Sequence, residues 1–146
     1  RTGMRVSEVL SLRASDLTLD GDQRVVRIRN GKGGKARMVP LHPELEAALR
    51  LTLAYSPAGD RFFPVDPSTA WRWVQEAFHR SREMGLITGH DRVGTHTLRH
   101  AAARHWLVSG VPINVVSRWL GHASIQTTLI YLAILPDPLG HMDRVP

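Results

Sequence analysis

Six polar residues spread through the chain have the side chains that a reaction at a phosphodiester needs. The transition state of such a reaction gathers negative charge on the non-bridging oxygens, which fixed cationic donors stabilise. A covalent route also needs a nucleophile, and a proton donor for the departing oxygen. The candidates, in chain order, are Arg5, Lys32, His96, Arg99, His122 and Tyr131.

The segment His96-Thr97-Leu98-Arg99-His100 presents two of these side chains at helical spacing. His96 and Arg99 are three residues apart, so one helix face would carry an imidazole beside a guanidinium. The same segment has the i, i+4 histidine spacing of a helical zinc site, but Thr97 stands where a His-Glu-x-x-His metalloprotease has its glutamate. A purely structural pair is the other alternative, and the segment alone leaves all three open.

Arg5, His122 and Tyr131 each have an ordinary structural interpretation as well. Arg5 stands three residues before Glu8 on an expected helix, so the two could form an ion pair. His122 lies in a turn between two expected helices, where its ring could point into a cleft. Tyr131 fits a buried structural tyrosine, and its ordinary pKa of about 10 means that nearby cations or a base must activate it before it attacks phosphorus.

Both lysines of the chain lie in one glycine-rich segment, residues 30–35. This segment is not a Walker A phosphate loop, because Lys35 is followed by Ala36 rather than by Ser or Thr. The flanking runs, RVVRIR at 24–29 and ARMVP at 36–40, are typical of paired strands, so the segment is predicted to be a hairpin loop. Lys32 in such a loop could reach a DNA groove or a leaving oxygen.

The elements that position these residues are mostly helices. Apolar periodicity, proline at first turns and glycine at C-terminal ends predict helices over residues 6–12, 43–53, 67–84, 96–109, 112–120 and 124–131. Thr95 is the expected N-cap of the helix that begins at His96, and Leu98 and Ala102 of that helix would face the core. We therefore predict a mainly α domain with a small antiparallel β-hairpin or sheet.

Length and composition restrict the class of protein. The 146 residues suit one domain, and the absence of cysteine excludes a disulfide framework, a thiolate nucleophile and a Cys-type zinc site. No stretch is apolar enough to span a bilayer, so no membrane partner is expected. The 19 Lys and Arg against 13 Asp and Glu give a net charge of +6, which favours a polyanionic partner. A GC-rich genome would also explain why all but two of these cations are arginine.

The order and spacing of the six residues resemble the tyrosine recombinase (phage integrase) family. The matching segments are TGMRVSEVLSL, GKGGKARMVPL, HTLRHAAARHWL and LGHASIQTTLIY, and together they run from residue 2 to about residue 133. The resemblance implies the catalytic-domain fold of DNA breaking-rejoining enzymes. It also implies a site-specific DNA recombinase or integrase that needs neither a cofactor nor a metal ion.

The resemblance assigns each candidate a role. Tyr131 would attack the scissile phosphate and form a 3′-phosphotyrosyl link, while Arg5 and Arg99 would bind the non-bridging oxygens. His122 would donate a hydrogen bond to the phosphate, Lys32 would protonate the departing 5′-oxygen, and His96 would assist proton transfer at the tyrosine. The remaining assignments are backbone contacts with DNA for Lys35 and Arg37, structural ion pairs for Glu8 and Asp16, packing or hydrogen bonding for His100 and His105, and a core position for Trp119.

The resemblance also implies a double-stranded DNA partner with an inverted-repeat core site, and a tetramer of the full-length protein on that DNA. The family carries a DNA-clamping core-binding domain before the catalytic domain, and this sequence starts without one. Residues 1–146 are therefore interpreted as an N-terminally truncated catalytic domain, which need not be active by itself. Residues 132–146 form a C-terminal tail that could dock on a neighbouring protomer. We expect a cytoplasmic, nucleoid-associated protein of bacterial or phage origin.

Two rival functions use the same residues. Residues 111–131 fit a helix-turn-helix, which would make the protein a non-catalytic DNA-binding regulator, but His96, Arg99 and the lysine hairpin then have no role. A degenerate integrase relic that binds DNA without turnover would share every motif. Of the three functions, the recombinase predicts a covalent protein–DNA adduct that Tyr131→Phe abolishes.

Overall fold

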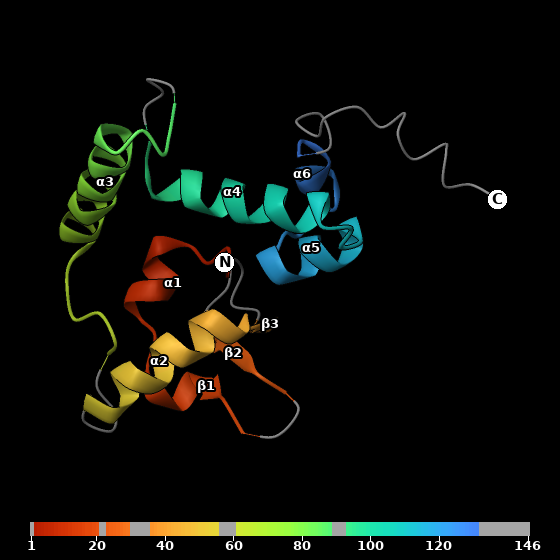
Figure 1. The fold of residues 1–146 in the computed structure, drawn as a ribbon. Coiled ribbons are helices and arrows are strands. Elements are labelled where there is room, and N and C mark those ends of the chain that lie inside the picture. Colours follow the sequence, from red (N-terminus) through yellow and green to blue (C-terminus); the bar gives the residue numbers. More distant parts are fainter. Residues whose placement is uncertain (1, 21–22, 30–35, 56–60, 89–92, 132–146) are drawn as a thin grey trace.

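The structure, a computed structural model, describes residues 2–20, 23–29, 36–55, 61–88 and 93–131 (Figure 1). These residues form mostly helices, with one small sheet. In chain order the elements are α1 (Val6–Leu10), the 3₁₀-helix η1 (Ala14–Asp16), β1 (Leu17–Thr18), β2 (Val25–Ile28), β3 (Arg37–Pro40), α2 (Pro43–Tyr55), α3 (Pro67–Glu83), α4 (Thr95–Val108), α5 (Ile113–Leu120) and α6 (Gln126–Leu129). The predicted fold class is confirmed.

The sheet is antiparallel, with strand order β1-β2-β3. Strands β2 and β3 pair Val26 with Val39 and Ile28 with Arg37, which confirms the predicted hairpin. The predicted loop of this hairpin, residues 30–35, lies outside the described residues. Strand β1 was not predicted, because two residues show no alternation that a sequence pattern could reveal.

Helix α2 covers the sheet and closes the first hydrophobic cluster (Figure 1). Alternation along the strands buries Val26 and Val39, which are 1% and 0% exposed, against Leu49 of α2 and Phe62. This helix continues two residues past its predicted end, to Tyr55. The predicted extended piece at 61–63 makes a single bridge, between Arg61 and Arg13.

A second cluster joins α4, α5 and the residues after α6. Ala103, Val116 and Leu120 are all 0% exposed, and Tyr131 packs with them. Trp106 contacts both clusters and meets Trp119 edge to face, with ring centroids 5.2 Å apart. Trp119 therefore has the predicted core position, and the two tryptophans connect the α4–α5 region to the sheet.

The ends of α4 and α5 hold candidate residues in place. The N-cap of α4 is Gly94 and not Thr95 as predicted, because the Thr97 hydroxyl accepts the Gly94 N–H at 3.1 Å and the helix already includes Thr95. Helix α5 ends at Gly121, as predicted, in the left-handed conformation with φ +68°. The residue after it, His122, begins the turn towards α6.

Two further expectations on α4 and α6 are wrong. Leu98 is 47% exposed rather than buried, because it lines an apolar cavity of about 380 Å³ between α1, α3 and α4. Ala102, in contrast, is buried as predicted. Helix α6 has four residues and ends before Tyr131, although the Ser124 hydroxyl does accept the Gln126 N–H near its start.

No helix in the described ranges is both long and apolar enough to cross a membrane.

Candidate active site

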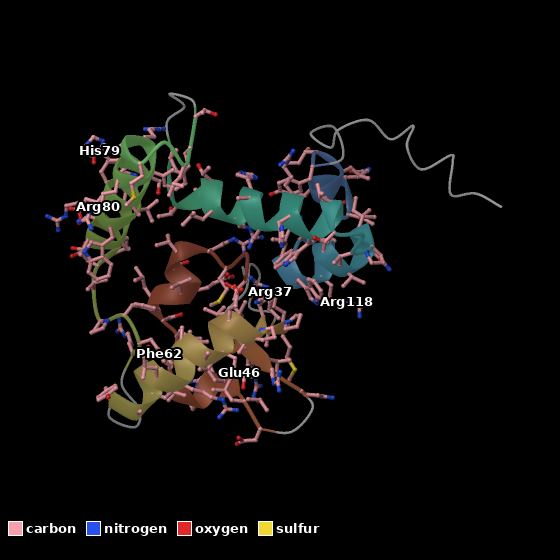
Figure 2. All side chains as sticks on the ribbon, viewed as in Figure 1. Arg37, Glu46, Phe62, His79, Arg80 and Arg118 are labelled. Atoms are coloured by element: carbon pink, nitrogen blue, oxygen red, sulfur yellow. The ribbon has the colours of Figure 1, made fainter. Side chains whose placement is uncertain are left out.

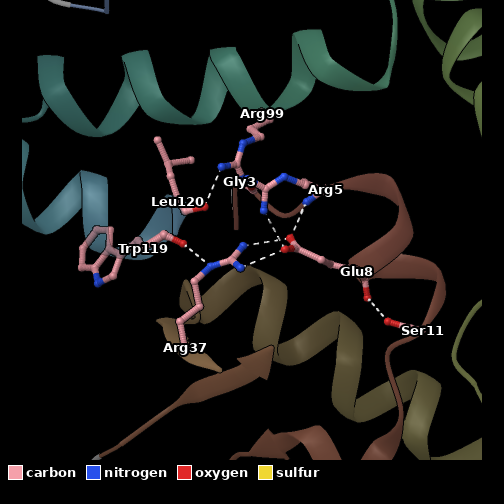
Figure 3. A network of polar contacts seen from close by, with 8 residues as sticks. All are labelled: Gly3, Arg5, Glu8, Ser11, Arg37, Arg99, Trp119 and Leu120. Carbon is pink, nitrogen blue, oxygen red and sulfur yellow. Dashed lines mark hydrogen bonds and ion pairs between the residues drawn. The ribbon is translucent and has the colours of Figure 1, made fainter. Parts of the chain in front are cut away.

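Arg99 points from α4 into the interior and is 6% exposed. Its Nη1 donates to the Gly3 carbonyl at 2.7 Å, and its Nη2 donates to the Leu120 carbonyl at 2.6 Å (Figure 3). Burial, followed by the positive charge of Arg5, lowers the pKa of Arg99 from its ordinary value to about 10. The guanidinium therefore stays charged at neutral pH while it ties α4 to the N-terminal segment and to the end of α5.

Arg5 immediately precedes α1 and pairs with Glu8, as the spacing predicts. The Arg5 backbone N–H donates to Glu8 Oε2 at 2.7 Å, and Arg5 Nη1 donates to Glu8 Oε1 at 3.0 Å. The side chain of Arg5 is 26% exposed, whereas that of Glu8 is 4% exposed. Arg5 is thus a cation held at the surface by a buried carboxylate.

Arg37 supplies the second cation on Glu8. Its Nη1 and Nη2 each donate to one Glu8 oxygen at 2.8 Å, and its Nε donates to the Trp119 carbonyl at 2.8 Å (Figure 3). Burial of Glu8 would raise the pKa of its carboxyl group, but hydrogen bonds from Arg37 and from the Arg5 backbone hold that pKa below its ordinary value. Glu8 is therefore ionised at neutral pH, and the predicted ion pairing is confirmed.

His122 and Tyr131 lie face to face at the end of the described chain. Their rings are nearly parallel, at 7°, with centroids 6.4 Å apart. His122 Nδ1 lies 2.7 Å from the Thr128 hydroxyl, a hydrogen bond in which either group can donate. Burial, followed by the charge of Arg99, lowers the pKa of His122 to about 4, so its imidazole is neutral at pH 7.

Tyr131 is 2% exposed, and its ring lies near two imidazole rings. The centroid of the His100 ring on α4 is 5.3 Å from that of the tyrosine ring. The two ring planes are tilted by 52°, whereas the His122 ring is stacked parallel to the tyrosine. Burial raises the pKa of the Tyr131 phenol, and the positive charge of Arg99 opposes that rise. In this arrangement the phenol keeps its proton, and His100 has the packing role that was predicted.

Four of the six candidates thus come together from distant parts of the chain. Arg99 interacts electrostatically with Arg5 and with Tyr131, and His122 interacts with both arginines. His96 is on the first turn of α4 and exposed, and no contact within the described ranges joins it to Tyr131. Lys32 and Lys35 lie outside the described residues.

Arg37 differs most from its expected place. We expected a DNA contact, but its side chain is 7% exposed and points into the middle of the molecule, whereas His79 and Arg80 of α3 project outwards (Figure 2). Its guanidinium is engaged by Glu8 and Trp119, so its placement favours a role inside the protein. Alternation along β3 was the available signal, since Arg37 and Val39 share one face of the strand.

Thr128 is the other residue that sequence reasoning missed. It is 0% exposed, its hydroxyl meets His122, and its carbonyl accepts the Tyr131 N–H at 3.1 Å. It therefore holds both the imidazole and the phenol in place. No sequence signal indicated this role, because Thr128 lies in a polar run next to another threonine.

The described residues contain no cluster of three or more His, Asp or Glu side chains suited to a metal ion.

Comparison with known proteins gives the family. Residues 1–137 match the phage integrase family. The tyrosine recombinase XerD of Caulobacter vibrioides is 34% identical over 151 residues, which cover 97% of this chain and 48% of that protein. A crystal structure of XerA recombinase has 31% identity and a TM-score of 0.76, and the match covers 99% of this chain and 54% of that one. The XerH recombinase bound to difH substrate in a pre-cleavage complex has 26% identity and a TM-score of 0.75, over 98% of this chain and 42% of that one.

The chain spans about half the length of the curated relatives that it matches. Residues 1–137, which match the family, include Arg5, Arg99, His122 and Tyr131. The chain belongs to the phage integrase family of tyrosine recombinases.

Proposed function

We propose that the protein cleaves and rejoins DNA strands at specific sites, with Tyr131 as the nucleophile. The phenolic oxygen would attack the scissile phosphorus, form a 3′-phosphotyrosyl bond and release a 5′-hydroxyl. The 5′-hydroxyl of another strand would then attack the phosphotyrosine and release the enzyme. The observation that carries this proposal is the gathering of Arg5, Arg99 and His122 around Tyr131 in a chain of this family.

The arginines have donors to spare for a phosphate. A guanidinium has five N–H donors, and the two carbonyls on Arg99 take two of them. Arg5 gives one side-chain nitrogen to Glu8, and its Nε and Nη2 have no protein partner in the part of the chain that the structure describes. Two partly satisfied guanidiniums can stabilise the charge that develops on the non-bridging oxygens.

His122 would act as a neutral hydrogen-bond donor. With the Thr128 hydroxyl on Nδ1, the other ring nitrogen can face the phosphate. A pKa of about 4 keeps the imidazole uncharged over the physiological range, so its role there is a hydrogen bond and not a second cation.

Lys32 and His96 complete the proposed proton transfers. Lys32 would protonate the departing 5′-oxygen, and Lys35 would contact the DNA backbone beside it. His96 would assist proton transfer at Tyr131, although it lies exposed at the start of α4. These roles follow from family membership and from the chemistry of the side chains.

Tyr131 must become accessible before it can react. With 2% of its surface exposed, the phenol cannot approach a DNA phosphate from its present position. Helix α6 is a single turn, and Leu129 and Ile130 beside the tyrosine are exposed, so within residues 126–131 the buried side chains of Thr128 and Tyr131 hold the segment to the core. We infer that a shift of residues 125–131 delivers the tyrosine to the phosphate.

The proposed partner is double-stranded DNA with an inverted-repeat core site. Relatives of similar fold have been crystallised as XerH with its difH substrate, before and after cleavage. A net charge of +6 fits a polyanionic partner. The proposal includes a tetramer of the full-length protein on this DNA, working in the cytoplasm at the nucleoid.

A covalent-trapping experiment tests the proposal. The full-length protein is incubated with a pool of singly nicked duplexes of random sequence, and covalent adducts are isolated on a denaturing gel. The wild type is expected to retain DNA through denaturation, and Tyr131→Phe is expected to retain none. An equal yield from both proteins would refute the assignment, and specific binding without any adduct would favour the regulator or the relic.

A further inference from the structure

Arg37 bonds through all three of its guanidinium nitrogens, and its partners are the carboxylate that pairs with Arg5 and the end of the helix that precedes His122. Two nitrogens go to the two oxygens of Glu8, and the third goes to the carbonyl of Trp119 (Figure 3). Sequence reasoning placed this residue against DNA, and none of the proposed chemical steps uses it. Its burial in β3 raises the question of what a fixed internal cation does there.

Glu8 is a carboxylate that two arginines share. Its two oxygens accept four hydrogen bonds, of which two come from Arg37, one from the Arg5 backbone and one from Arg5 Nη1. A carboxylate and a guanidinium prefer a bidentate pair with two parallel hydrogen bonds. Arg37 has that pair, and Arg5 is restricted to a single side-chain bond.

We propose that Arg37 is a positioning residue that keeps Arg5 available for the phosphate by occupying Glu8. This inference rests on the proposed function. If Arg37 were absent, Glu8 would be a buried anion with one cation beside it, and the Arg5 side chain would close onto it as the bidentate partner. The nitrogens that Arg5 needs for a non-bridging oxygen would then be turned inwards.

Arg37 also fixes the turn that carries His122. It binds the Trp119 carbonyl and Arg99 binds the Leu120 carbonyl, so two guanidiniums hold successive carbonyls at the C-terminal end of α5. The next residue, Gly121, lies against Arg37 so closely that a Cβ there would be 2.9 Å from the Arg37 Cδ. One side chain thus sets the position of both the first arginine and the histidine turn.

The position of Arg37 in β3 links the same site to the hairpin. It pairs with Ile28 in the last described pair of the β2–β3 ladder, and residues 30–35 lie between these two positions along the chain. That segment contains Lys32, the proposed acid for the leaving oxygen. Strand β3, which follows that segment along the chain, is therefore anchored to Glu8 and to α5 through one guanidinium.

The test is a pair of substitutions in the full-length protein, assayed on a nicked duplex recovered from the trapping experiment. Arg37→Met is expected to lower the single-turnover cleavage rate about 100-fold, as misplacement of a reacting group by about 1 Å can do. Binding of the same duplex should change far less, so the loss is in the cleavage step. Glu8→Gln added to Arg37→Met removes the charge that captures Arg5 and should raise the rate about tenfold above that of Arg37→Met.

Two further variants control for folding and for loss of charge. Arg24→Met removes another arginine that pairs with a buried carboxylate, Glu46, away from Arg5, and should cleave as the wild type does. Arg37→Lys keeps the positive charge on a single nitrogen, and its single-turnover cleavage rate should be about tenfold below that of the wild type. If Arg37→Met unfolds at the assay temperature, Arg37→Lys takes its place in the comparison.

The outcomes are distinct. Cleavage by Arg37→Met and Arg37→Lys at the wild-type rate would overturn the inference and leave Tyr131 chemistry intact. Failure of Glu8→Gln to raise the rate of the Arg37 variant would show a general structural defect and would also overturn it. If the wild type forms no Tyr131-dependent adduct, the proposed function fails and the inference fails with it.

Discussion

At the scale of single residues, each hydrogen-bonding side chain of the site is held by a fixed partner within the protein. Arg99 is held by two carbonyls, Arg5 by Glu8, and His122 by Thr128. The fixed partners orient the donors before any substrate arrives, which is how preorganised electrostatic stabilisation works. The phenol of Tyr131 is the exception, because it is buried with its proton in place.

The leaving-group role of Lys32 makes a chemical prediction. A 5′-bridging phosphorothiolate needs no proton to depart, so it should restore cleavage by Lys32→Ala to near the wild-type rate. The same substrate should not restore Arg99→Ala, whose defect is in stabilising the non-bridging oxygens. Single-turnover cleavage of the two substrates measures both effects, and equal rescue of the two variants would exclude Lys32 as the general acid.

His122 predicts a pH dependence of stability. The unfolded imidazole titrates at about 6.5, and burial lowers the folded pKa to about 4. The unfolded chain therefore binds the proton first, so stability falls as the pH drops from about 6.5 to about 4 and is unaffected by this group outside that window. Because the ring is partly exposed, we expect a loss on the order of 1 kcal/mol.

Urea unfolding at pH 7 and at pH 4.5 checks this prediction. The comparison is made between the wild type and His122→Asn, so that the other titrating groups cancel. The wild type should lose more stability than the variant on acidification. An identical pH response of the two proteins would contradict it.

At the scale of elements, turns and helix ends bring the residues together. Gly3, with φ +60°, lets the N-terminal segment pass against Trp106 and Leu120, where a Cβ would be 2.9 Å from the Trp106 ring. This close approach puts the Gly3 carbonyl within reach of Arg99. Gly121, with φ +68°, likewise lets the chain at the end of α5 pass close to another side chain, that of Arg37.

Gly121→Ala is predicted to destabilise the protein more than Gly85→Ala does. The two glycines have φ values of +68° and +69°, so alanine suffers the same backbone strain at both. A Cβ at position 121 also meets Arg37 at 2.9 Å, whereas nothing lies within 4 Å of one at position 85. Because of this overlap, we expect Gly121→Ala to lose about 1–3 kcal/mol more of its free energy of unfolding than Gly85→Ala does, as measured by urea unfolding. Equal losses of unfolding free energy in the two variants would contradict this, because the Arg37 side chain would then move aside without destabilising the protein.

The sequence predicts an element well where a pattern, such as apolar alternation or proline and glycine at the ends, extends over several residues. The alternation in RVVRIR predicted β2, and the proline and glycine positions predicted the limits of α2, α3 and α5 to within about two residues. The two-residue β1 and the one-turn α6 are too short to carry a period. The N-cap of α4 was misassigned because Gly94 and Thr95 both suit that position and only the Thr97 hydrogen bond decides between them.

At the scale of the whole molecule, the site lies where two hydrophobic clusters meet. Strand β3 supplies Arg37, α1 supplies Glu8, and Arg5 immediately precedes α1. The region of the second cluster supplies Arg99 from α4, His122 from the turn after α5, and Tyr131, which is itself part of the cluster. The order of these residues along the chain was readable in the sequence, but the pairing of Arg37 with Glu8 was not, because it joins positions 29 residues apart through tertiary packing.

The positive charge of the molecule predicts salt-sensitive DNA binding. Each phosphate contact releases counterions, so affinity for a duplex should fall steeply with salt. With at least two contacts, a fourfold rise in monovalent salt should weaken binding about tenfold. Fluorescence anisotropy on a random-sequence duplex measures this, and Tyr131→Phe should show the same slope. Affinity that does not change with salt would contradict a phosphate-binding surface.

The most direct measurement of the central claim is the chemical identity of the protein–DNA link. The adduct formed by the full-length protein is digested with trypsin and nuclease, and the peptide that contains Tyr131 is analysed by mass spectrometry. The proposed reaction predicts a nucleotide joined through its 3′-phosphate to the Tyr131 oxygen. A nucleotide on any other side chain, or one joined through a 5′-phosphate, would contradict it.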